Sequence, residues 1–202
     1  EFARRFPRSE VIVQEDTTVR LLAQIDNAEI DMALVSFPVE APFLAGQPLF
    51  DDELLLAMPD GHHLARAAEI PLTDLAGEDF ILLREGHCLS DQTEDFCRES
   101  AAFCPRVACR SAQMETVLAM IRGGLGISLV PALARNAPSV GGLILRSLTP
   151  AIHRSIGLVW RKNRNLCLVA RAFRECIEAI RPTGSADGRK PKASRIRQPV
   201  PV

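Results

Sequence analysis

Short apolar runs alternate along the chain with segments whose apolar residues recur at helical spacing. Each apolar run is of strand length and is bounded by polar residues, glycine or proline. The predicted strands are Glu10–Val13, Met32–Val35, Pro48–Met58 with a break at Asp51 and Asp52, Phe80–Leu83, Val107–Cys109, Ile127–Val130, Leu143–Leu145 and Ile156–Trp160.

Four helices are predicted between or after these strands. The first starts with Thr17 or Thr18 as its cap, and the others cover Cys88–Ser100, Ser111–Arg122 and the amphipathic segment from Leu166 to Ile180. Two single turns are also expected, at Pro71–Leu75 with Thr73 as the cap and at Pro131–Arg135.

Alternating strands and helices indicate the α/β class with a mostly parallel arrangement. The strands and helices fall into two series, which predicts two Rossmann-like lobes joined by two crossover strands. Lobe I comprises residues 1–77 and 152–181, and lobe II comprises residues 78–151. Residues 182–202 are rich in Gly, Ser, Pro, Lys and Arg, a composition typical of a disordered basic tail.

The chain of 202 residues has a formal net charge of −1, which conceals a charge asymmetry. Residues 181–202 hold six Lys or Arg and one Asp, so residues 1–180 hold 18 basic and 24 acidic residues and carry a net charge of −6. An acidic body repels a phosphate backbone, so any DNA-reading part is expected outside this chain.

We expect no membrane span, because no apolar run approaches roughly 20 residues, and no secretory leader, because the first residues lack an apolar stretch.

The densest polar cluster is Glu85–Gln92, which contains His87, Cys88 and Asp91 and lies where a predicted strand gives way to a helix. A thiol at a helix start is near backbone N–H groups and the positive end of the helix dipole, and both favour the reactive thiolate. The alternative is that Cys88 is simply a small buried apolar residue, as most thiols are.

Four of the six cysteines lie between positions 88 and 109. If residues 88–97 are helical, the Cα atoms of Cys88 and Cys97 are about 13 Å apart and the side chains lie on opposite faces. A disulfide requires Cα atoms within about 7 Å. This pair could therefore bond only after the helix unwinds, which is the behaviour of a switch.

The segment Gly86-His87-Cys88-Leu89-Ser90-Asp91-Gln92, followed by Phe96-Cys97, resembles the redox signature of the OxyR family of peroxide-sensing LysR-type transcription regulators. The resemblance extends over nearly all of residues 1–181. It includes Leu21–Asp26, Leu49–Asp52, Gly124–Ala134 and Ile156–Arg161, of which the last three are shared in weaker form across LysR-type effector domains. It implies two lobes similar to the type 2 periplasmic-binding-protein fold.

The resemblance also implies roles for individual residues. Cys88 matches the peroxidatic cysteine and Cys97 the resolving cysteine, with His87 and Asp91 as polar neighbours of the reactive thiol. Thr18 matches a pocket hydroxyl that helps hold peroxide, and Arg161 matches a nearby cation. Ser90 stands where the family often has a basic residue, and Cys104 and Cys109 are additional.

The implied protein is a cytoplasmic transcription activator responding to oxidative stress rather than an enzyme, with no cofactor and no metal. Its implied partners are hydrogen peroxide, further copies of itself in a dimer or tetramer, and a reductant such as glutaredoxin or thioredoxin. DNA would bind through an N-terminal winged helix-turn-helix that this chain lacks.

Three alternatives stay open at this point. The chain could be a LysR-type effector domain that binds a small organic ligand between its lobes. It could also be an enzyme with Cys88 as nucleophile, although His62, His63 and His153 lie in turn-like segments expected to be exposed. A zinc site built from His87 and the clustered cysteines is the third, and it lacks the usual short Cys pairs.

Overall fold

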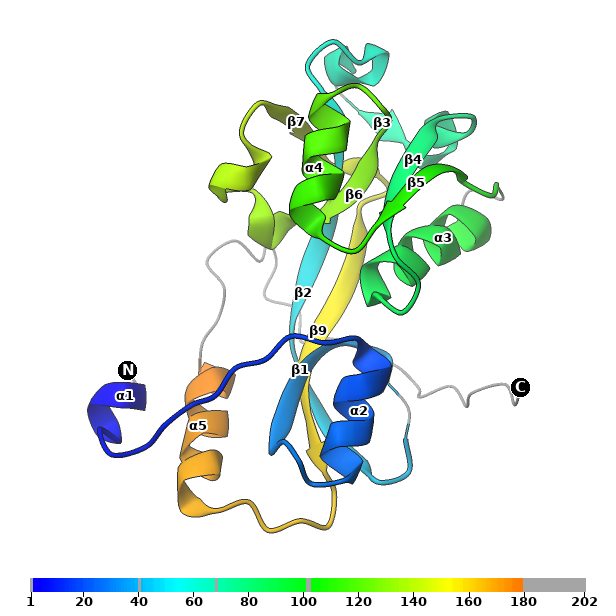
Figure 1. Cartoon of the computed structure of the whole chain (residues 1–202). Helices are drawn as coiled ribbons and strands as arrows, with labels where there is room; N and C mark the ends of the chain where they lie inside the picture. Colours follow the sequence, from blue (N-terminus) through cyan, green and yellow to red (C-terminus); the bar gives the residue numbers. More distant parts are fainter. Residues whose placement is uncertain (1, 40, 68, 101–102, 180–202) are drawn as a thin grey trace. The chain divides into compact units, whose positions relative to one another are not determined.

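The computed structural model describes residues 2–39, 41–67, 69–100 and 103–179 (Figure 1). The chain divides into two compact units, one formed by Glu1–Asp51 with Ser155–Val202 and the other by Asp52–Arg154. The two crossings lie within the long strands β2 (Leu44–Pro59) and β9 (Ile152–Arg161). The predicted basic tail at residues 182–202 lies outside the described residues.

The first unit contains four further elements besides its parts of β2 and β9. They are α1 (Phe2–Arg5), α2 (Thr18–Asp26), β1 (Met32–Phe37) and α5 (Leu168–Ala179). The second unit contains β3 (Ile70–Pro71), β4 (Asp79–Leu83), α3 (Cys88–Ser100), β5 (Arg106–Ser111), α4 (Met114–Arg122), β6 (Ser128–Pro131), β7 (Leu143–Arg146) and β8 (Leu148–Thr149). Single 3-10 turns in this unit cover His63–Arg66, Leu72–Leu75, Ala132–Ala134 and Pro138–Val140.

The core of the first unit lies between α2 and the antiparallel pair β1–β9. Ile25 of α2 is fully buried against Val35 and Val159. A side chain at position 157 could not fit here, because a Cβ added to Gly157 would lie 2.4 Å from the Phe37 ring. Glycine thus permits β9 to pass close to β1 and β2.

The predicted strand at Glu10–Val13 was wrong. These residues form no strand, and Ile12 and Val13 are 81% and 82% exposed. Their apolar side chains fit a strand pattern, but a strand also needs a neighbouring strand to satisfy its backbone groups, and none pairs with this segment among the described residues.

Of two predicted caps, one is confirmed in position and the other is wrong. Thr17 is the N-cap residue of α2, although its side chain donates or accepts no capping hydrogen bond. The turn at Leu72–Leu75 is a 3-10 turn that starts after Pro71, so Thr73 lies inside it and does not cap it.

Strand β2 enters the second unit with an apolar run that is buried on both faces. Leu54, Leu56 and Met58 join one core cluster, and Leu55 and Ala57 join another. This run packs against the series that begins at β4, which is why the first crossing falls at Asp51 and not after residue 77 as predicted.

Strand directions are mixed in the second unit. β2 pairs antiparallel with β6 and β7, whereas β4 pairs parallel with β5 and forms a parallel bridge from Phe80 to Ile127. The prediction of a mostly parallel arrangement was therefore wrong, although the α/β class and the two lobes match. A Cβ on Gly126 would lie 2.3 Å from the Asp79 carbonyl oxygen, so glycine allows this bridge to form.

The predicted break of β2 at Asp51 and Asp52 was also wrong. Asp52 is 4% exposed, and its carboxylate accepts hydrogen bonds from Arg154, at 2.9 and 3.1 Å, and from the Leu133 N–H at 3.2 Å. A buried carboxylate with a cationic partner can lie inside a continuous strand.

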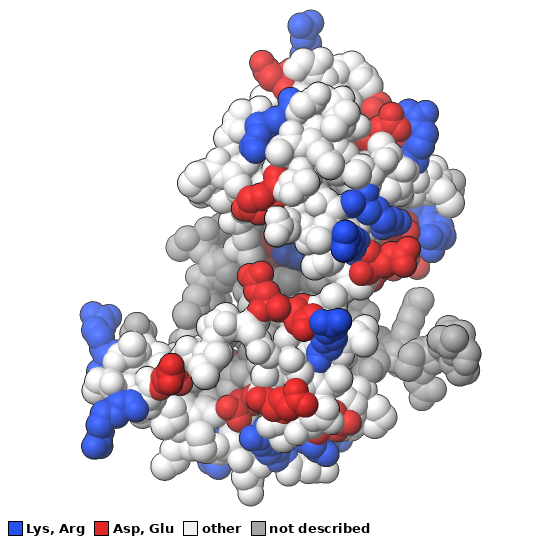
Figure 2. Space-filling model, in the orientation of Figure 1, with Lys and Arg blue, Asp and Glu red and all other residues white. Residues whose placement is uncertain are grey.

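Charges of both signs lie next to one another on the visible surface (Figure 2). Basic side chains do not merge there into one continuous patch of the kind that binds a phosphate backbone. None of the described helices has the length and apolar character needed to cross a membrane.

Candidate functional site

The candidate site lies where β4 turns into α3. Gly86, with a φ of +88°, turns the chain, and the His87 carbonyl then accepts hydrogen bonds from the N–H groups of Ser90 and Asp91. Cys88 is thus the first residue of a 13-residue helix, as the sequence predicts. Its half-buried thiol lies at the positive end of the helix dipole.

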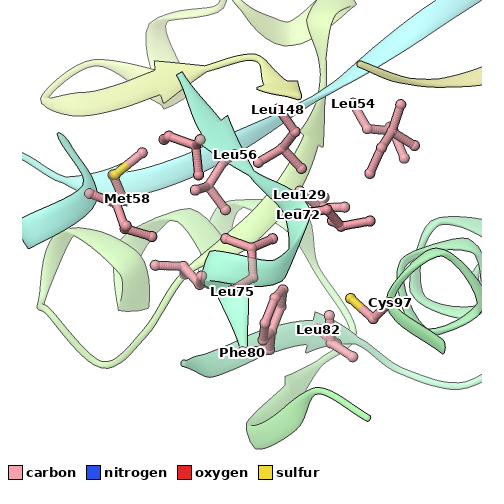
Figure 3. Close-up of a cluster of buried hydrophobic side chains, with 14 of the residues drawn as sticks. Leu54, Leu56, Met58, Leu72, Leu75, Phe80, Leu82, Cys97, Leu129 and Leu148 are labelled. Atoms are coloured by element: carbon pink, nitrogen blue, oxygen red, sulfur yellow. The ribbon is translucent and has the colours of Figure 1, made fainter. Parts of the chain in front are cut away.

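Cys97 lies on the same helix in a very different environment. It is fully buried in the cluster that contains Phe80, Leu82 and Leu129 (Figure 3). Burial, followed by the nearby charge of Glu94 and the thiol of Cys104, raises the pKa of Cys97 to about 11 from an ordinary value of 9.0. The Cys97 thiol is therefore protonated at neutral pH and lies out of solvent.

The two thiols are far apart along α3. Nine helical steps of about 1.5 Å separate their Cα atoms by about 13 Å, and nine rotations of about 100° place the side chains on opposite faces. All six cysteines are present as thiols. The helical form thus keeps these two thiols too far apart to form a disulfide.

Arg110 of β5 attaches the first half of α3 to the sheet. Its guanidinium donates to Ser90 Oγ at 2.9 Å and to the Leu83 carbonyl at 3.4 Å, and it forms an ion pair with Glu94. Sequence reasoning missed Arg110. The only signal was a charged residue following the apolar strand Val107–Cys109, which is more typical of a solvated strand end.

Asp91 projects from the exposed side of the first turn of α3. Partial burial raises its pKa, and the negative charges of Glu94 and Asp95 add to this shift, while Arg110 opposes it. Next to it, the buried Gln92 Oε1 accepts no hydrogen bond. The start of α3 therefore combines a thiol, an amide oxygen that accepts no hydrogen bond and a carboxyl group with a raised pKa.

Thr18 and Arg161 belong to the first unit and are not brought together there. Thr18 is the first residue of α2, whereas Arg161 pairs with Asp26, the last residue of the same helix, through its carbonyl and its carboxylate at 3.5 Å. Eight helical steps separate the two ends by about 12 Å. The pocket roles of Thr18 and Arg161 stay predictions, and within the second unit the cation next to α3 is Arg110.

The remaining cysteines occupy varied positions. Cys104 and Cys167 are exposed, and Cys109 and Cys176 are half-buried. Phe103, which precedes Cys104, donates its N–H to the Cys97 carbonyl at 3.2 Å, so Cys104 follows closely on the buried thiol. In the described part of the chain, His87 and the cysteines form no cluster with the spacing of metal ligands.

Comparison with known proteins places this geometry in context. Residues 1–181 match the model of the LysR substrate binding domain. The chain is 36% identical over 178 residues to the DNA-binding transcriptional dual regulator OxyR of Escherichia coli K12, covering 87% of the chain and 57% of that protein. The chain thus spans little more than half the length of this relative.

Two solved structures share the fold. The crystal structure of the reduced form of OxyR superposes with a TM-score of 0.74 at 33% identity, covering 88% of this chain and 84% of that one. The C-terminal domain of a probable LysR family transcriptional regulator from Rhodococcus sp. RHA1 gives 0.79 at 30% identity, covering 88% of each chain. The family match over residues 1–181 and these similarities show that the chain belongs to the LysR substrate-binding domain family.

Proposed function

We propose that this chain is the peroxide-sensing regulatory domain of an OxyR-type transcription regulator, with Cys88 as the peroxidatic cysteine and Cys97 as the resolving cysteine. The observation that carries the proposal is the contrast between the two thiols of α3. Cys88 is half-buried at the helix start, whereas Cys97 is fully buried on the opposite face nine residues later. The similarity to peroxide regulators over most of the chain supports it.

The chemistry takes place in two balanced steps. The Cys88 thiol releases its proton, and the thiolate attacks one oxygen of hydrogen peroxide. The O–O bond breaks to give a Cys88 sulfenic acid and hydroxide, and the hydroxide takes up the released proton and leaves as water. The Cys97 thiol then displaces the sulfenic hydroxyl as a second water, and a Cys88–Cys97 disulfide forms. Peroxide is reduced, and the two thiols are oxidised.

The second step requires a change of structure. A disulfide needs Cα atoms within about 7 Å, roughly half the distance that α3 imposes. The bulk of α3 must therefore unwind, and Cys97 must leave the cluster that includes Phe80 and Leu82. The oxidised form then presents a different surface in the second unit, which a regulator can transmit to a partner.

The wider assembly follows from this proposal. We expect a cytoplasmic regulator that acts as a dimer or tetramer, binds DNA through a winged helix-turn-helix in its remaining part, and is reset by a glutaredoxin or thioredoxin. The OxyR of Escherichia coli K12 is longer than this chain, which covers 57% of it, so a full-length protein of the same kind has room for such a domain.

The test is thiol mapping by mass spectrometry after a brief micromolar pulse of hydrogen peroxide. We expect one intramolecular disulfide between Cys88 and Cys97, and Cys167, exposed in the first unit, to stay a thiol as an internal control. Oxidation of Cys167 at the same rate as Cys88 would overturn the proposal, because the response would then reflect exposure alone. A disulfide that excludes Cys88 would also contradict it.

A further inference from the structure

The side chains of His62, His63 and Glu78 converge outside the candidate redox site. One nitrogen of each imidazole and one oxygen of the carboxylate lie within 4.8 Å of one another. His62 Nε2 is 3.3 Å from Glu78 Oε2, and His63 Nε2 is 3.2 Å from Glu78 Oε1. From these residues we propose a binding site for a divalent transition-metal ion, most suitably Zn²⁺.

The surrounding structure holds these three groups in place. The two imidazole rings stack with their centroids 4.6 Å apart, so both direct Nε2 toward the same carboxylate. His62 Nδ1 accepts a hydrogen bond from the Leu64 N–H at 3.3 Å, which fixes Nε2 as the nitrogen that faces Glu78. The sequence prediction that His62 lies exposed was wrong, because its side chain is only 15% exposed.

The cluster also has an approach from solvent. The side chain of His63 is 68% exposed, whereas that of Glu78 is 20% exposed. A cavity of about 140 Å³ is lined by His62 and Glu78 together with Pro59, Asp79, Arg106, Gly124, Leu125 and Gly126. An ion held by the three side chains could therefore complete its coordination with water from this side.

The donor set selects the class of metal. Two imidazoles and one carboxylate suit Zn²⁺, Ni²⁺ or Cu²⁺, whereas Mg²⁺ and Ca²⁺ prefer oxygen ligands alone. Three protein ligands with an open position match the coordination of Zn²⁺ in sites that also hold water. The ion would replace the two Nε2 protons that otherwise bridge each imidazole to Glu78.

Binding of a metal ion to His62 has a free-energy cost that lowers the affinity of the site. A metal on His62 Nε2 moves the ring proton to Nδ1. Nδ1 then no longer accepts the hydrogen bond from the Leu64 N–H, and two N–H groups face one another. We therefore expect weaker binding than at a closed structural zinc site. The bound ion would link His63, after β2, to Glu78, ahead of β4, across fifteen residues of the second unit.

The experiment is a calorimetric titration of the reduced 202-residue chain with ZnCl₂, together with thermal unfolding in the presence of the metal. We expect one saturable site and a Tm that rises with zinc concentration, because an ion that binds only the folded state stabilises it. His63→Ala and Glu78→Gln are each expected to weaken the binding by at least about tenfold. The matched control is His153→Ala, which removes an exposed histidine of β9 and should leave the binding unchanged.

Cobalt(II) distinguishes this site from zinc held by thiols. Thiolate ligands give an intense near-ultraviolet charge-transfer band, whereas imidazole and carboxylate ligands give only weak visible bands. We expect the weak bands alone, and their loss in His63→Ala. Absence of one-to-one binding, or a charge-transfer band that persists in His63→Ala, would overturn the proposed site and leave the redox proposal untouched.

Discussion

The two cysteines of α3 differ in burial and in the side chains around them. At the first residue, Cys88 is half-buried, next to polar side chains and the positive end of the helix. At the tenth residue, Cys97 is fully buried among apolar side chains, and burial raises its pKa to about 11. One regular helix thus creates one accessible thiol and one protected thiol.

This difference suggests how a helix can work as a redox switch. In the proposed switch, the protected thiol stays unreactive while α3 is folded and becomes a nucleophile only after the helix opens. Loop-closure entropy for the short Cys88–Cys97 segment is a few kcal/mol, and the loss of two or three helical turns with their packing is of similar size. Both are costs of the oxidised form and add to one another, so the free energy released when the sulfenic acid becomes a disulfide must exceed their sum for the switch to operate.

The largest expected effect comes from removing one thiol at a time. Cys88→Ser should abolish peroxide-driven oxidation at micromolar peroxide, because the remaining thiol of the pair is buried and protonated. Cys97→Ala should instead leave Cys88 reactive and trap it as a sulfenic acid, which dimedone labels and mass spectrometry detects. Equal behaviour of the two variants would remove the proposed distinction between the ends of the helix.

Oxidation should next produce a local loss of structure that hydrogen exchange can measure. In the oxidised chain, we expect amides of residues 88–100 to lose protection and those up to Cys109 to change, because the bond cannot form across an intact helix. Helix α4, Met114–Arg122, is the internal control and should keep its protection. Unchanged protection of α3 with the Cys88–Cys97 bond confirmed would contradict the unwinding argument.

The raised pKa of Cys97 predicts a pH dependence of stability of up to about 3 kcal/mol. The folded state keeps the proton to about pH 11, whereas the unfolded thiol loses it near pH 9. This contribution to stability is therefore fully present below pH 9 and is lost as the pH rises toward 11. Urea unfolding of wild type and Cys97→Ala across this range should show a steeper decline for wild type, and parallel curves would contradict it.

The smallest expected effect concerns Arg110, which holds the Cys88 end of α3. Arg110→Gln should destabilise the chain by about 1–2 kcal/mol, because it weakens the contacts to Ser90, Glu94 and the Leu83 carbonyl. Arg98→Gln is the matched control on the same helix. Its ion pair with Asp95 is exposed at 60% and 61%, so its loss should change the free energy of unfolding by less than about 0.5 kcal/mol.

Arg110 also bears on the reaction of Cys88. Ser90 accepts a hydrogen bond from Arg110, which brings a positive charge to the same turn as Cys88. Arg110→Gln should therefore slow the reaction of Cys88 with peroxide, while Arg98→Gln should not. Stopped-flow measurement of thiol loss would compare the two, and equal rates would limit Arg110 to a structural role.

Local patterns predicted much of the fold for a clear physical reason. Apolar runs such as Phe80–Leu83 form strands because both faces are buried, and Cys88–Ser100 forms a helix because its buried positions follow helical spacing. The same patterns failed where a distant partner was needed. Val11–Val13 has strand-like residues without a pairing strand among the described residues, and Asp52 fits inside β2 because Arg154, 102 positions away, and the Leu133 N–H compensate its charge.

By itself, the sequence determined the α/β class, the position of Cys88 at a helix start and its separation from Cys97, because these depend on neighbours within a few turns. The tertiary structure decided the strand directions, the burial that raises the pKa of Cys97, the cation at α3 and the convergence of His62, His63 and Glu78. Each of these depends on residues that are distant in sequence. Pairing, desolvation and ligand geometry act through space, and a linear pattern of side chains does not contain those distances.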